Sequence, residues 1–212
     1  MLKHNHEKLL QLLTKKNYMT FHNTYIITKN LREKINKDPK KYAKFKKVWI
    51  DEFKGGCVPY AEFVNFIITG KYNNKLLKSG FKRINSSDEK TIDNILNLLD
   101  KGPLVFKYNS RTPKRYTPEH YFFIIKSELK YILAQGYKEA YIQKIKIYTQ
   151  SQIITLLTDI IDNLTDTKDK TKTWGDLNLS VYRKYFHNDP DLKKLNPNNK
   201  IDGMYLYYKL IN

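Results

Sequence analysis

Residues 57–70 constrain the fold most, because apolar side chains lie on nearly all sides of the helix that their spacing predicts. Gly55 and Gly56 interrupt the chain before this segment, and Pro59 is tolerated in the first turn of a helix. Gly70 is typical of the residue that ends one. The sequence therefore predicts a buried central helix with Cys57 in its first turn.

Shorter patterns predict the other elements. Thr149 with Gln152 and Ser86 with Glu89 form capping boxes ahead of apolar stripes, which predict helices over residues 149–164 and 86–101. Strands are expected over residues 104–108, 120–126, 129–135 and 204–210. Residues 137–147 fit a strand or a short helix.

Composition limits the class of protein and its compartment. At 212 residues and 41% hydrophobic content the chain is long enough for one globular domain with a sizeable core. No apolar run reaches the roughly 18 residues of a membrane span, and residues 1–6 lack the apolar core of a signal peptide. One cysteine cannot form an internal disulfide. We expect a protein of the reducing cytoplasm, or one that is delivered into a cell.

The net charge of +18 predicts attraction to polyanions. Residues 1–56 hold fourteen basic and five acidic residues, a net charge of +9. Nucleic acid or an acidic partner is therefore expected to meet this region, and biased codon usage is the alternative source of so much lysine. The candidate contacts are Lys40, Lys41, Lys44, Lys46 and Lys47.

Cys57 is the candidate nucleophile. A thiolate is favoured at a helix N-terminus, where backbone N–H groups are exposed and the helix dipole is positive. A reactive thiol also needs a base, and His120 opens the apolar run of residues 121–125 directly after a polar loop. The alternative is that Cys57 is a small core residue.

Gln135 is the candidate partner of His120. Residues 120–126 and 129–135 are separated by Ser127 and Glu128, which suggests a two-residue hairpin turn. A turn centred there places Gln135 directly opposite His120, with Cβ atoms about 5 Å apart. The amide oxygen then accepts the imidazole proton and fixes the ring.

A cysteine at the head of a buried helix, a strand that opens with histidine and an adjacent strand with an amide follow one another in this chain. This order resembles that of the papain-like cysteine hydrolases. The segment from Ile95 to Ile125 contains a helix, the strand Lys101-Gly102-Pro103-Leu104-Val105 and the run from His120, and it looks similar to bacteriocin-processing peptidases and papain-fold toxin and deamidase domains. The resemblance covers roughly residues 50–165.

The resemblance implies an α+β fold in which the central helix packs on an antiparallel sheet. It also implies an amide hydrolase, a protease or a glutamine deamidase acting on a protein substrate without a cofactor, with Cys57 as nucleophile, His120 as base and Gln135 as orienting residue. Residues 1–53 are then a basic helical region, 54–165 the papain-like core and 166–212 a loop-rich extension that closes the same domain. The glutamine that papain-like enzymes place several residues before the cysteine is missing, since the nearest one upstream is Gln11.

Other classes of function stay open. The protein could instead be a basic binding protein for RNA or for a partner protein, of the immunity type, or an inactive copy of the papain-like fold. In both cases Cys57 would only be a packed side chain. A metal-independent ribonuclease around Glu7 and the lysine-rich segment is the third alternative. No CxxC or HExxH motif predicts a metal site.

Overall fold

The structure, a computed structural model, describes residues 6–27, 57–73, 75–84, 90–111, 119–136, 143–162, 184–185 and 203–211. These residues form helices and an antiparallel sheet, which confirms the α+β class. The chain divides into two compact units, one of Met1–Ser79 with Ala134–Ile145 and one of Gly80–Leu133 with Lys146–Asn212. The segment of the predicted central helix and the N-terminal residues lie in the same unit. The predicted division into residues 1–53 and 54–165 assigns them to different regions.

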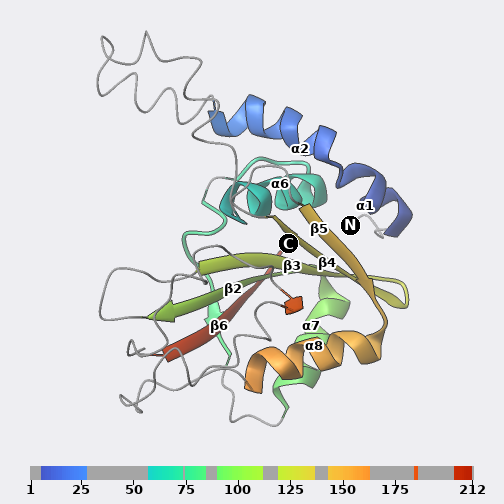
Figure 1. Ribbon diagram of the computed structural model, residues 1–212, viewed down its shortest axis with the longest axis vertical. Coiled ribbons are helices and arrows are strands. Elements are labelled where there is room, and N and C mark those ends of the chain that lie inside the picture. The colour runs from blue at the N-terminus through green and yellow to red at the C-terminus, as the bar shows by residue number, and fades with distance from the viewer. Residues whose placement is uncertain are drawn as a thin grey trace. The chain divides into compact units, whose positions relative to one another are not determined.

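In the part of the chain that the structure describes, the sheet has six strands in the order β1-β6-β2-β3-β4-β5 (Figure 1). β6 pairs antiparallel with β1 and with β2, and β2 pairs antiparallel with β3. The last strand of the chain therefore lies inside the sheet, which confirms the strand predicted over residues 204–210 and adds β1, which was not predicted. The strands are β1 (Lys82–Arg83), β2 (Leu104–Arg111), β3 (Glu119–Ser127), β4 (Lys130–Gly136), β5 (Gln143–Tyr148) and β6 (Gly203–Leu210).

The turn between β3 and β4 differs from the prediction by one residue. β3 ends at Ser127 and β4 begins at Lys130, so the turn consists of Glu128 and Leu129. Glu128 has a φ of 56°, in the left-handed region, and Leu129 is 89% exposed. The strand predicted to begin at Leu129 therefore begins at Lys130, and Leu129 lies at the tip of the turn.

Two helices cover one face of the sheet in the second unit, α7 (Thr91–Lys101) and α8 (Gln150–Asp162) (Figure 1). Alternate strand residues contribute to the core with these helices because successive side chains of a strand point to opposite faces. The ring centroids of Phe106 and Phe122 lie 5.0 Å apart. The buried strand members of this core are Leu104, Phe106, Tyr108, Phe122, Ile124, Tyr131, Leu133 and Leu206.

Helix α6 (Cys57–Thr69) is the buried helix that the sequence predicted. All of its residues from 60 to 65 are buried, so successive residues of nearly two turns are covered on every side. Among the described residues of the first unit, three helical segments precede it. They are α1 (His6–Leu12), α2 (Lys15–Phe21) and the π-helical η1 (His22–Ile27).

Several predicted helix ends are confirmed by their hydrogen bonds. Gly70 has a φ of 70°, and its N–H donates to the Phe66 carbonyl at 2.8 Å. At the start of α8 the N–H of Thr149 donates to Gln152 Oε1 at 2.9 Å, and the N–H of Gln152 donates to Thr149 Oγ1 at 3.3 Å. The other predicted capping box falls within residues 85–89, outside the described residues, and α7 begins at Thr91.

Candidate functional site

Cys57 is the first residue of α6. Its thiol forms no disulfide, and the residue is partly exposed. The first N–H groups of a helix have no acceptor within the helix, and together with the dipole they favour an anion at this end. The position of Cys57 is therefore the one that the sequence predicted and suits a nucleophilic thiol.

Aromatic side chains hold α6 in place. The Tyr18 ring of α2 lies 5.6 Å from the Tyr60 ring and 5.5 Å from the Phe63 ring, between centroids, and Phe21 lies 5.5 Å from Phe63. Tyr60 is 2% exposed, and burial raises the pKa of its hydroxyl. That hydroxyl has no hydrogen-bond partner among the described residues. These contacts pack Tyr60 and Phe63 of α6 against α2.

His120 lies on β3, where its register partner on β2 is Tyr108. The residue is 4% exposed, and its ring lies 6.3 Å from that of Phe122 with an angle of 18° between the planes. Tyr108 and Phe122 both belong to the core beneath α7 and α8. The imidazole is therefore buried in a packed, aromatic environment.

Gln135 lies near the end of β4 and is fully buried, with 0% exposure. The register count that placed it opposite His120 assumed a turn at Ser127 and Glu128. The turn instead consists of Glu128 and Leu129. By the same count, His120 and Gln135 are then not directly opposite each other, so the hairpin no longer supports their predicted pairing. Neither side chain lacks a partner, as buried polar groups require.

The predicted lysine contacts, Lys40, Lys41, Lys44, Lys46 and Lys47, lie outside the described residues. Within the described part of the chain, no group of three or more His, Cys, Asp or Glu side chains is placed to hold a metal ion. None of the helices in that part is long and apolar enough to cross a membrane.

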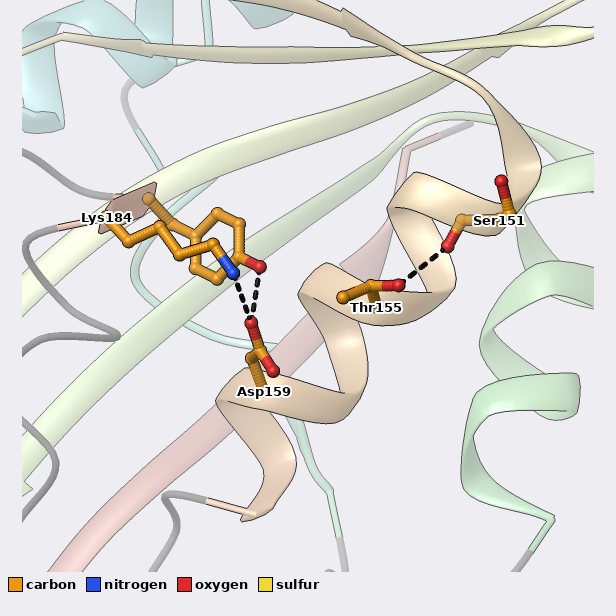
Figure 2. Close-up of polar contacts among 5 residues, drawn as sticks. Ser151, Thr155, Asp159 and Lys184 are labelled. Carbon is orange, nitrogen blue, oxygen red and sulfur yellow. Dashed lines mark hydrogen bonds and ion pairs between the residues drawn. The ribbon is translucent and has the colours of Figure 1, made fainter.

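A polar cluster on α8 was not predicted. Asp159 Oδ2 accepts hydrogen bonds from the Tyr185 hydroxyl at 2.5 Å and from Lys184 Nζ at 2.9 Å (Figure 2). The hydrogen bond from Tyr185, which has the larger effect, and the one from Lys184 lower the pKa of the Asp159 carboxyl. Burial and the hydrogen bond to Asp159 raise the pKa of the Tyr185 hydroxyl. Thr155, one turn earlier on α8, donates its hydroxyl proton to the Ser151 carbonyl at 3.1 Å. The Asp159 contacts join residues 184–185 to α8.

A row of cations and aromatic rings crosses four strands of the sheet. Arg83 on β1 pairs in register with Tyr207 on β6. Tyr207 also pairs with Lys107 on β2, and Lys107 pairs on its other side with Tyr121 on β3. The alternating residue types along β6 indicate a strand with two different faces. The row itself was not predictable, because its four residues come from segments as far apart as residues 83 and 207.

Comparison of the chain with protein-family models, with curated proteins and with solved structures finds no match.

Proposed function

We propose that the protein is a thiol hydrolase that acts on an amide bond, with Cys57 as its nucleophile. The observation that carries the proposal is the position of a partly exposed thiol as the first residue of α6, a helix whose next turns are buried. A nucleophile must be reachable by substrate and fixed in direction, and this position meets both needs. His120 is proposed as the general base and Gln135 as the residue that orients it, within a papain-like fold.

The burial of His120 and Gln135 is compatible with these roles. Burying a polar side chain is unfavourable unless it is hydrogen-bonded, so a core position with histidine or glutamine calls for an explanation. His120 is 4% exposed and Gln135 is 0% exposed, on two neighbouring strands of the sheet. A base and its orienting amide have to be held rigidly, which burial achieves.

The reaction follows from these roles. The Cys57 sulfur attacks the carbonyl carbon and forms a C–S bond, while the imidazolium of His120 donates its proton to the leaving nitrogen as the C–N bond breaks. Water, deprotonated by His120, then hydrolyses the thioester, which releases a carboxylic acid and returns the thiol. The N–H of Cys57 is a candidate donor to the carbonyl oxygen as negative charge develops on it. Peptide cleavage and glutamine deamidation share this sequence and differ only in the amine released.

Alkylation by iodoacetamide as a function of pH tests the proposal on the native protein. Since the chain has one cysteine, each labelled molecule carries a single carbamidomethyl group, which mass spectrometry counts. We expect a labelling midpoint below the value of about 8.5 for a free cysteine. The urea-unfolded protein is the reference, and a native midpoint at or above its value, or labelling only after unfolding, would contradict the proposal.

Two variants separate the roles. Cys57→Ala should abolish both peptide cleavage and ammonia release from glutamine-containing peptides. His120→Gln keeps a neutral hydrogen-bonding side chain and should raise the labelling midpoint toward the unfolded value. A low midpoint that His120→Gln leaves unchanged would exclude His120 as the partner of the thiol. A low midpoint without turnover of any amide substrate would indicate an inactive copy of such an enzyme.

A further inference from the structure

Four aromatic rings meet at the C-terminal end of α6 in the first unit. They belong to Phe21 of α2, Tyr25 of η1, Phe66 of α6 and Tyr72, which follows α6 in the chain. The Tyr25 and Tyr72 rings are stacked, with centroids 4.9 Å apart and an angle of 29° between their planes. Phe21 lies 5.2 Å from Tyr25 and 5.7 Å from Tyr72, between ring centroids. We call Tyr25 and Tyr72 the tyrosine stack.

The tyrosine stack is held in place and keeps part of its surface accessible. Phe21, on its inner side, is 3% exposed, whereas Tyr25 and Tyr72 are both half-buried. The Tyr72 hydroxyl lies 3.5 Å from Oε2 of Glu62, a buried residue of α6. Rings that only filled a core would gain more from full burial. The stack therefore presents oriented aromatic surface to a partner from solution.

Lysines follow the tyrosine stack in the chain. Lys71, Lys75 and Lys78 are exposed, and in the part of the chain that the structure describes none of their ammonium groups forms an ion pair or a hydrogen bond. The N–H of Lys78 donates to the Lys75 carbonyl at 3.0 Å, and such a turn brings the two Cα atoms within about 7 Å of each other. Leu76, inside the turn, is 5% exposed and anchors it. Lys75 and Lys78 thus present neighbouring positive charges to solvent.

The charge of this segment has one sign. Residues 63–79 contain three lysines and no acidic residue. Lys71 lies just beyond the C-terminal end of α6, where a cation is favourable because the helix dipole is negative there, so this lysine has a structural explanation. Lys75 and Lys78 lie farther from the helix end and outside the range of that effect. Their charges attract polyanions, in agreement with the net charge of +18 of the whole chain.

We propose that the tyrosine stack and the turn of Lys75 and Lys78 bind single-stranded nucleic acid. A base stacks on the accessible ring surface, and the two lysines contact phosphates. Proteins that bind single strands combine a basic surface that follows the backbone with aromatic rings that stack on bases. A duplex or an acidic protein would use the charges but would offer no unpaired base to the rings. About 18 Å of helix separates this end of α6 from Cys57, so the site is distinct from the proposed thiol chemistry.

Fluorescence anisotropy with labelled single-stranded RNA of about 12 nucleotides tests the proposal on the full chain, with KCl varied and a duplex of the same length as comparison. The double variant with Lys75→Gln and Lys78→Gln is compared with one that carries Lys101→Gln and Lys130→Gln, two exposed lysines of the second unit. Tyr25→Leu is compared with Tyr25→Phe, which keeps the ring at the same position. Circular dichroism establishes that each variant is folded.

The wild-type protein should bind the single strand more tightly than the duplex. Loss of Lys75 and Lys78 should lower the slope of log K against log salt by about 1.4, since each phosphate contact with a single strand contributes about 0.7. The control pair of lysines should leave the slope unchanged. Tyr25→Leu should weaken binding at least about fivefold with an unchanged salt slope, whereas Tyr25→Phe should bind as the wild type does.

Three results would overturn the proposal. The first is no binding of single strands at low salt. The second is an equal change of slope in the two double variants, which would mean diffuse attraction by the net charge. The third is unchanged affinity of folded Tyr25→Leu, which would mean a polyanion site without base stacking. Because Cys57→Ala leaves the tyrosine stack intact, it should bind RNA as the wild type does even if the hydrolase proposal fails.

Discussion

Gly136 is the position at which the structure makes its sharpest prediction about stability. A Cβ atom added there would lie 2.5 Å from Cγ and 2.6 Å from Cβ of Tyr60. Ordinary contacts are 3.4 Å or longer, so the Tyr60 side chain or the backbone of β4 would have to move by nearly an ångström. Tyr60 is 2% exposed and packs against Tyr18 and Phe63, so its displacement disturbs those rings as well.

The expected cost follows from these contacts. Overpacking a well-filled core costs about 1–3 kcal/mol, and this clash involves atoms next to the backbone, so we take the upper end. Replacing glycine by alanine also restricts the unfolded chain, which offsets about 0.4–1 kcal/mol. Gly136→Ala should therefore lower the free energy of unfolding by about 2 kcal/mol.

Urea unfolding followed by far-UV circular dichroism and by tyrosine fluorescence measures this quantity, and coincidence of the two curves establishes a single transition. The control is Gly70→Asn. A Cβ at Gly70 meets nothing within 4 Å, and asparagine tolerates the left-handed conformation of that residue. Gly136→Ala within about 0.5 kcal/mol of the wild type would refute the close approach of Tyr60 to β4.

Three further changes test other parts of the structure. Gly70→Ala should cost about 1 kcal/mol from its φ of 70° alone, and an equal cost for Gly70→Asn would contradict that reason. Leu156→Ala, at 0% exposure in α8, should lower the free energy of unfolding by about 2–5 kcal/mol, whereas Leu129→Ala at the exposed turn should change it little. The pKa of Asp159 is lowered from 3.8 in the folded state, so its contribution to stability is present above about pH 4 and is lost as the pH falls through the folded value. Asp159→Asn should therefore be destabilising at pH 7 and become progressively less so as the pH falls below about 4, as thermal unfolding over this range will measure; an effect that does not change with pH would contradict the charged hydrogen bonds.

The sequence by itself determined the features that depend on neighbouring residues. Helix α6 begins at Cys57 and ends before Gly70 as predicted, because the apolar pattern and a glycine with positive φ are both local signals. The capping box of Thr149 and Gln152 fixed the start of α8 for the same reason. The buried character of α6 was also predictable, since apolar residues on every side exclude a surface position.

The candidate site was predictable only in part. Cys57 could be placed at a helix start, and His120 at the beginning of a strand. The pairing of Gln135 with His120 was not reliable, because moving a two-residue turn by one position changes every pair in the hairpin. Ser127, Glu128 and Leu129 carry no strong turn signal, so the tertiary structure decided which two of them form the turn.

The tertiary structure alone decided which distant segments became neighbours. β1 has only two residues, and its pairing with β6 comes from hydrogen bonds between residues more than a hundred positions apart. That pairing brings Arg83 beside Tyr207 in the row of cations and aromatic rings that crosses four strands. The packing of α6 likewise decides that Tyr60 lies against Gly136. Such contacts follow from how strands and helices pack to bury apolar surface across the whole chain, and no local pattern encodes which residues then meet.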